Sequence, residues 1–255
     1  MRKKLSVGLL AAIAISASIA ALAHGERVQL GNLVLNVDAG FQPSSLSKHH
    51  FSPIGISGHA DIGTVDGTLP SALRQVVVNW DRNGRLTTRG LPRCDSARIE
   101  QATTDAARSI CGKALIGTGS LAATIASPGE APVQARSLVL IFNGIPDHGR
   151  AVILLHAYAY LPTPTAYVIP VIITKLHGGR YGYQSSLEMP SIADGHGVVT
   201  HFAFSVRRRY RLGGRTMSVV SARCPDQHLQ VAGTISFADG SMASGSIVHG
   251  CHGRG

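Results

Sequence analysis

The sequence predicts an all-β protein, either an antiparallel β-sandwich or an open barrel, with one short helix. Apolar and polar side chains alternate along most of the chain, and this period of two is typical of half-buried strands. Turn-forming residues separate these stretches at short intervals, and a helical period occurs only between Cys94 and Cys111. We expect about ten to twelve strands, and the α/β classes are excluded because crossover helices are missing.

The alternation places most of the strands directly. In chain order they are expected at 28–37, 53–64, 75–80, 86–88, 114–126, 133–143, 198–207 and 228–237, with a last strand ending near 249. Segment 75–80 precedes Asp81–Gly84, a turn sequence that leads directly into 86–88, so we expect these two strands to form a hairpin. Between the first two strands, Gly40–His50 contains Ser, Pro and His residues and is expected to be a linker.

One helix is expected between Cys94 and Cys111. Thr104 is placed to cap its N-terminus, Asp105 suits the first turn, and Gly112 can end the segment. Because so short a helix is unstable alone, we expect a disulfide bond to hold it against the sheet.

The core is expected in Arg150–Leu176, the most apolar stretch outside the N-terminus. Leu161–Pro164 divides it, because each proline fixes φ and removes a backbone donor, so the stretch predicts two core strands. A membrane span is the alternative, since 151–174 contains no Asp, Glu, Lys or Arg. Three prolines inside it and a period of two favour strands instead.

The N-terminus has the three parts of a secretory signal peptide. Met1–Lys4 is positively charged, Leu5–Ala20 is apolar, and small residues ending at Ala23 form a cleavage site. We expect a signal peptide over 1–23 and a mature chain that begins at His24, with an uncleaved anchor as the alternative. No cysteine lies directly after the apolar region, so a lipid attachment site of the bacterial lipoprotein kind is not expected.

The chain has 255 residues and a net charge of +10, and removal of Arg2, Lys3 and Lys4 with the signal leaves about +7. Such a length can bury a core as one domain. We divide the mature chain into an N-terminal strand and linker, 24–52, and a single all-β domain, 53–255. The positive charge favours association with anionic surfaces, and a role in solubility alone is the alternative.

Cysteine content indicates disulfide bonds in an exported chain. Cys94, Cys111, Cys224 and Cys251 allow three connectivities, and we favour the sequential pairs because each closes one local unit. A metal site is the competing interpretation, but CxxC and HxxxH spacings do not occur, and only His249–His252 places several potential metal ligands close together in the sequence. No metal is expected.

Motifs for catalysis are weak. Gly55–His59 and Gly117–Ser120 are near misses to Gly-x-Ser-x-Gly, and neither has the strand-to-helix elbow that the motif needs. His156, Tyr158 and Tyr160 recur every second residue on one face of an expected strand. They could line a pocket with the histidine as acid or base. A packed, hydrogen-bonded core histidine is the alternative.

Arginines crowd one expected hairpin near the C-terminal third of the chain. The residues of this candidate contact are Arg207, Arg208, Arg209, Tyr210, Arg211 and Arg215. Guanidinium groups suit phosphate and carboxylate groups, and the tyrosine can stack, so an anionic ligand is expected. A solvated hairpin whose charges prevent edge-to-edge pairing is the alternative. Sequence-specific nucleic-acid recognition is not expected, because no reading helix and few aromatic residues accompany the charge.

Short runs of the chain carry a family likeness: GLPRC (Gly90–Cys94), LLHAY (Leu154–Tyr158), ARCPD (Ala222–Asp226) and FADGS (Phe237–Ser241). They resemble a family of exported bacterial proteins of no assigned function, and the likeness covers most of the mature chain. The resemblance implies one exported domain with two local disulfides, and it implies no catalytic residue.

Together these features predict a secreted or periplasmic, disulfide-stabilised basic protein that binds or builds rather than catalyses. Its expected partners are anionic polymers or lipid headgroups of the cell envelope or extracellular space. No cofactor is expected, and no transmembrane span after cleavage. The alternative is a secreted hydrolase or isomerase with a pocket around His156.

Overall fold

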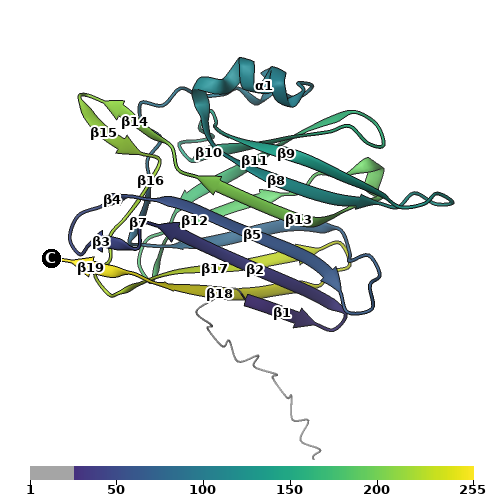
Figure 1. Ribbon diagram of the computed structural model, residues 1–255, viewed down its shortest axis with the longest axis horizontal. Coiled ribbons are helices and arrows are strands. Elements are labelled where there is room, and N and C mark those ends of the chain that lie inside the picture. The colour runs from purple at the N-terminus through teal and green to yellow at the C-terminus, as the bar shows by residue number, and fades with distance from the viewer. Residues whose placement is uncertain (1–25) are drawn as a thin grey trace, which may run out of the picture.

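The computed structural model describes residues 26–255 (Figure 1). The expected signal peptide 1–23 and the mature start at His24 lie outside the described residues. Within the described chain the expected all-β class is confirmed, because a large antiparallel sheet forms most of the molecule and α1 (Thr104–Cys111) is the single α-helix. No helix in this part of the chain is long and apolar enough to cross a membrane.

Twelve strands form the large sheet, and all neighbouring strands in it are antiparallel. Across the sheet their order is β1 (Glu26–Leu30), β2 (Leu33–Gln42), β5 (Gly55–Thr64), β13 (Gly197–Val206), β8 (Leu115–Ile125), β9 (Val133–Asn143), β10 (Ala151–Ala159), β11 (Thr165–Lys175), β12 (Tyr181–Glu188), β6 (Leu73–Asp81), β17 (His228–Phe237) and β18 (Met242–Gly250). The sheet curls until β1 and β2 lie against β18 at its other edge, so it is nearly barrel-like (Figure 1). The first strands of the segment 24–52 therefore belong to the same sheet as the rest of the chain.

Glu26 connects the two edges of this sheet. Its side chain lies over Gly245 of β18, where a Cβ would collide with the carboxylate, and it accepts a hydrogen bond from the backbone N–H of Ser246. Burial raises the pKa of Glu26, and the hydrogen bond from Ser246 offsets only part of that rise. Glycine at position 245 thus permits the close approach of β1 to β18.

The two core strands expected within Arg150–Leu176 are β10 and β11, which confirms the expectation. Strand β10 and the second half of β9 (139–143) are buried on both faces, which explains their nearly continuous apolar sequence. On the inner face Val139, Ile141 and Ile153 pack together. The outer face lies beneath α1, and the residues packed there are Ile99, Ala107, Leu140, Phe142, Val152 and Leu154.

Both expected disulfides are present, Cys94–Cys111 and Cys224–Cys251, and no cysteine of the described chain is free. The first holds α1 over the outer face of the sheet, as expected. The helix is capped by Thr103, whose hydroxyl accepts from the N–H of Ala106, and not by Thr104, which is the first helical residue.

Smaller sheets gather at one end of the large sheet (Figure 1, left). They are β14 (Arg209–Leu212) with β15 (Arg215–Ser218), β4 (Ser52–Pro53) with β16 (Val220–Ala222) and β7 (Gly84–Leu86), and β3 (Ser45–Ser47) with β19 (His252–Arg254). Three 3₁₀ turns complete the elements: η1 (Ser96–Arg98) and η2 (Gly112–Ala114) flank α1, and η3 (Ala193–Gly195) precedes β13.

The hairpin expected around Asp81–Gly84 is wrong. Strand β6 pairs with β12 on one side and β17 on the other, so it has no free edge for the following strand, β7. The chain turns after Asp81, where the N–H of Asn83 donates to the Asp81 side chain at 2.8 Å, and β7 leaves to pair with β16.

The strand expected at 28–37 is also interrupted. Gly31, with φ of +56°, and Asn32 turn the chain between β1 and β2, which pair with each other in a tight hairpin. A left-handed φ is one that glycine adopts without steric cost, so this residue permits the turn. Alternating apolar residues continue through both strands, which is why the sequence pattern does not reveal the turn.

Candidate anion-binding surface

The arginine-rich segment forms a β-hairpin that projects from the large sheet (Figure 1). Strand β14 pairs with β15 across Gly213 and Gly214, whose φ angles are +55° and +76°. Its tyrosine anchors it, because the Tyr210 hydroxyl donates to the carbonyl of Arg89 at 2.8 Å. Leu212 also packs directly over Gly90, where a Cβ would lie 2.6 Å from its Cδ1. The hairpin therefore contacts the 87–91 segment.

All the arginines of the hairpin are exposed, and none of them forms an ion pair within the described residues. Arg207 donates to the hydroxyl of Ser205 at 2.9 and 3.2 Å, a neutral partner that leaves its charge uncompensated. Tyr210 is partly buried instead, and burial raises its pKa, so it is neutral at ordinary pH. The guanidinium groups are thus open to a ligand.

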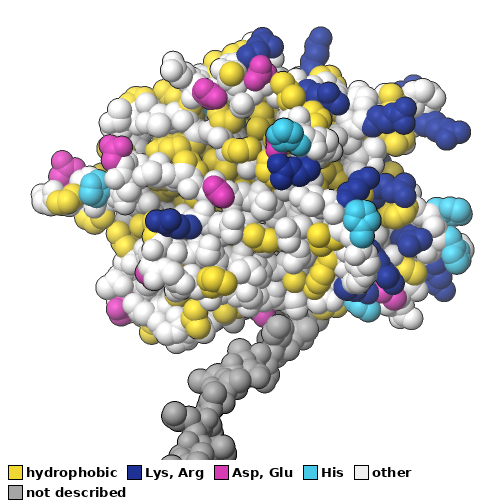
Figure 2. All heavy atoms as spheres, turned by 180° about the vertical axis from the view of Figure 1, so that it is seen from behind, with side chains coloured by type: hydrophobic (Ala, Val, Ile, Leu, Met, Phe, Trp, Pro, Cys, Tyr) yellow, Lys and Arg dark blue, Asp and Glu magenta, His cyan; other side chains and the backbone are white. Residues whose placement is uncertain are grey.

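Positive charge gathers over the whole end of the molecule that carries the hairpin (Figure 2, right). We call this the basic end, and it consists of 43–54, 82–114, 144–150, 176–180, 207–227 and 251–255. Every Lys and Arg of residues 26–255 lies in these segments, except Arg27, Arg74, Arg136 and Lys175.

Charge at the other end of the sheet has the opposite sign. We call it the opposite end, formed by 31–32, 65–72, 126–132, 160–164, 189–196 and 238–241. It contains no Lys or Arg, and its carboxylates are Asp66, Glu130, Asp194 and Asp239. An anionic partner is thus attracted to one end of the molecule and repelled by the other.

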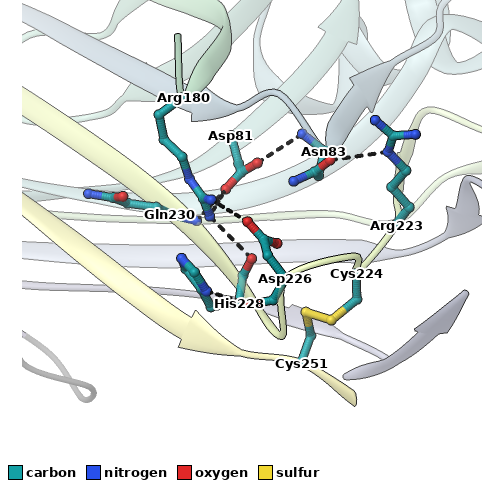
Figure 3. The surroundings of a disulfide bond; sticks show 9 residues. All are labelled: Asp81, Asn83, Arg180, Arg223, Cys224, Asp226, His228, Gln230 and Cys251. Atoms are coloured by element: carbon teal, nitrogen blue, oxygen red, sulfur yellow. Dashed lines mark hydrogen bonds and ion pairs between the residues drawn. A yellow bond between two sulfur atoms is a disulfide. The ribbon is translucent and has the colours of Figure 1, made fainter. Parts of the chain in front are cut away.

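An ion cluster forms around the buried Asp81 at the same end of the sheet (Figure 3). Asp81, with 5% of its side chain exposed, accepts the N–H groups of Asn83 and Gln230 at 2.8 Å each. Its carboxylate also lies 2.6 Å from the guanidinium of Arg180, which binds Asp226 as well. Burial alone would raise the pKa of Asp226, but the hydrogen bond and charge of Arg180 lower it below its ordinary value.

The cluster continues toward the disulfide Cys224–Cys251 (Figure 3). Arg223 donates from Nε to the side-chain oxygen of Asn83 at 3.1 Å, and Asn83 is itself buried. The guanidinium of Arg85 stacks over Phe51 at 3.9 Å, which places a further exposed arginine on an aromatic face. The strands and loops that carry the basic end are therefore held in fixed positions.

The structure separates the three residues of the expected His156 pocket. His156 has no exposed surface, and its Nε2 is 2.9 Å from the backbone carbonyl of Ala102. Burial lowers the pKa of His156, and backbone hydrogen bonds oppose that shift only in part. Tyr158 and Tyr160 do lie together, with ring centroids 4.9 Å apart, and 64% of Tyr160 is exposed. The two tyrosines thus face solvent while the histidine is sealed beneath the α1 segment.

The structure contains one polar cluster that the sequence does not reveal. Asp61 of β5, Ser120 of β8 and His201 of β13 lie side by side on the outer face of the sheet. They are far apart in the sequence and belong to no short motif, so only the strand order brings them together. The one local hint of this cluster in the sequence is Gly117–Ser120, a near miss to the Gly-x-Ser-x-Gly nucleophile motif.

No group of three or more His, Cys, Asp and Glu side chains suited to a metal ion occurs within residues 26–255. Comparison with protein-family models, with curated proteins and with solved structures finds no match for the chain.

Proposed function

We propose that the protein is an exported binding or structural protein that contacts anionic polymers or lipid headgroups through its basic end. The observation that carries this proposal is the β14–β15 hairpin with the two residues that lead into it, whose five arginines are exposed and have no carboxylate partner among the described residues. Two disulfides fit an extracellular or periplasmic protein and support this location.

Physical chemistry favours a polyanion as the ligand. Guanidinium groups held close together repel one another, and a chain of phosphates, sulfates or carboxylates relieves that repulsion while its own counterions are released. A single small anion would neutralise only one or two of the arginines. We therefore expect affinity that grows with the length of the anionic chain and falls steeply with salt.

The alternative function, a hydrolase or isomerase with a pocket around His156, has less support. A general acid or base must reach its substrate, and the imidazole of His156 is fully buried. Its hydrogen-bond partner is the backbone carbonyl of Ala102 and not a carboxylate. This environment is that of a packed histidine in the core.

The test compares two triple variants that lose the same charge from different places. The first replaces Arg207, Arg209 and Arg211 with serine, and the second, its matched control, replaces the exposed Arg27, Arg74 and Arg136. Both are applied to heparin columns and to phosphatidylglycerol and phosphatidylcholine vesicles. We expect the hairpin variant to elute at lower salt and to lose phosphatidylglycerol binding, while the control variant behaves like the parent. Equal elution of all three proteins would refute the proposal.

A further inference from the structure

Asp61, His201 and Ser120 are arranged like the carboxylate, imidazole and hydroxyl of a catalytic triad. Nδ1 of His201 lies 2.6 Å from the Asp61 carboxylate, and Nε2 of the same ring lies 3.4 Å from the Ser120 hydroxyl. The carboxylate thus favours the tautomer with the proton on Nδ1, which leaves Nε2 as the acceptor that faces Ser120. Carboxylate, imidazole and hydroxyl therefore form a continuous chain of hydrogen bonds.

A β-bulge places His201 in this position. Val199 pairs with Ala123, but His201 pairs with Ala122, so β13 contains one extra residue at Thr200. Val199 is buried, and two residues later regular alternation would point His201 to the same inner face. The bulge turns it to the outer face, directly opposite Asp61 of β5. Bulges of this kind commonly re-aim a side chain at a functional site.

A shallow hollow adjoins the serine. It is lined by Ser120, Ala122, Arg136, Leu138 and His201, among others, and so combines a nucleophile, a base, a cation and an apolar side chain. Leu138 is 44% exposed and lies opposite Ser120 in the β8–β9 register, while Arg136 lies opposite Ala122. Arg136 and the apolar side chain can thus meet different parts of one substrate.

We propose that Ser120, His201 and Asp61 form a serine-hydrolase site for carboxylic esters. His201 Nε2 takes the hydroxyl proton as Ser120 Oγ attacks the carbonyl carbon, and the Arg136 guanidinium faces the negative charge that develops on the carbonyl oxygen. Collapse breaks the ester C–O bond, and the proton on His201 goes to the leaving alcohol. Water then attacks the acyl-serine with His201 as base, which releases the carboxylic acid and restores Ser120.

The site goes beyond the binding proposed for the basic end and is independent of it. It occupies the outer face of β5, β13, β8 and β9 and includes none of the hairpin arginines. Loss of heparin retention in the hairpin variant and loss of ester hydrolysis in a Ser120 variant are therefore separate results.

The test uses the full chain with a fluorophosphonate probe and with p-nitrophenyl acetate. Attack by Ser120 Oγ on phosphorus displaces fluoride and leaves a phosphonylated serine that mass spectrometry locates. We expect the label on Ser120, and loss of both labelling and hydrolysis in Ser120→Ala. Ser57→Ala is the matched control, because Ser57 is also exposed and shares the outer face of β5 with Asp61. An unlabelled Ser120, or unchanged hydrolysis in Ser120→Ala, overturns the proposal.

The partners of Ser120 are tested by labelling rate and by conservative replacement. We expect His201→Ala to slow labelling by about 100-fold or more, the usual contribution of a general base. Asp61 is a positioning residue, so Asp61→Asn should slow labelling because an amide no longer holds the tautomer with the proton on Nδ1, and Asp61→Glu should restore part of the rate.

Other charged or titratable side chains lie on the nearby strands: His59 of β5, Asp38 of β2, Arg27 of β1 and Arg136 of β9. His59→Gln is therefore run alongside Asp61→Asn, and its labelling rate should match that of the parent. Parent-like labelling in His201→Ala would overturn the assignment of the base. A parent-like rate in Asp61→Asn, or no recovery of rate in Asp61→Glu, would overturn the positioning role of the carboxylate.

Discussion

The two ends of the sheet use charged side chains in different ways. At the opposite end, Asp66 accepts from the N–H and hydroxyl of Thr68 at 3.0 and 2.7 Å, and Asp239 accepts from those of Ser241 at 2.9 and 2.6 Å. Both carboxylates satisfy the backbone of the turn in which they lie. At the basic end, the arginines of the β14–β15 hairpin and of the two residues before it have no carboxylate partner within the described chain, and Arg207 donates only to the neutral hydroxyl of Ser205.

This difference separates charges that build the fold from charges that are free to bind. Asp66 and Asp239 at the opposite end already have hydrogen-bond donors, which a ligand would have to displace. The hairpin arginines are exposed and have no carboxylate partner among the described residues, so their charges are open to a polyanion. At the same end of the sheet, Asp81, Arg180 and Asp226 bind one another and hold strands and loops together.

The largest effect is expected from the disulfide beneath the basic end. Cys224 and Cys251 are 27 residues apart, and replacing both with alanine should lower the free energy of unfolding by about 3.5 kcal/mol through loop-closure entropy. Urea denaturation measures this loss. A change under about 1 kcal/mol would mean that the surrounding strands hold the basic end without the covalent bond.

The next effect concerns the ion cluster around Asp81. Asp81→Asn should lower the free energy of unfolding by about 2 kcal/mol, because it removes a buried charge that accepts from Asn83 and Gln230 and pairs with the partly exposed Arg180. Asp66→Asn, at the opposite end, is the matched control and should cost far less, since its turn is exposed. Equal losses in urea titrations of the two variants would erase the distinction between buried and surface carboxylates.

Acid should lower the stability of the turns at the opposite end. Hydrogen bonds from the Thr68 side chain, and from Asn32, lower the pKa of Asp66, and those from the Ser241 side chain lower the pKa of Asp239. A lowered folded pKa contributes stability that is present above the ordinary aspartate value, about 3.9, and is lost as pH falls through the folded value.

Replacing Asp66 and Asp239 with asparagine should therefore flatten the decline of melting temperature below about pH 4. Near-UV circular dichroism during thermal unfolding measures the melting temperature of both proteins at each pH. The parent and the double variant would decline in parallel if these two turns carry none of the acid sensitivity.

Local features of the fold are predictable from the sequence, and long-range ones are not. The disulfide pairs, the helix and the two core strands each depend on residues close in the chain, and each is confirmed. The hairpin expected at Asp81–Gly84 is wrong because strand β6 is already paired on both sides, by β12 and β17. Turn sequence reports local backbone geometry and carries no information about which distant strand occupies an edge.

The same limit applies to the candidate sites. The hairpin arginines are adjacent in sequence, so their clustering follows from the chain alone. The Asp61, Ser120 and His201 cluster depends on the strand order β5, β13, β8 and on a bulge at Thr200. Strict alternation groups His201 with Val199 on one face, whereas the bulge places them on opposite faces. Only the register of the folded sheet reveals this cluster.

The salt dependence of binding tests the central claim most directly, namely that the hairpin arginines are the charges free to bind. The dissociation constant for heparin is measured between low and moderate salt for the parent, the Arg207, Arg209 and Arg211 serine variant, and the Arg27, Arg74 and Arg136 serine variant. Because each lost ionic contact lowers the slope of log Kd against log salt by about one, the hairpin variant should lose a slope of about three. The control variant should keep the parental slope, and all three proteins should keep similar melting temperatures. If both variants lose the same slope, net charge alone drives binding and the hairpin is a solvated edge.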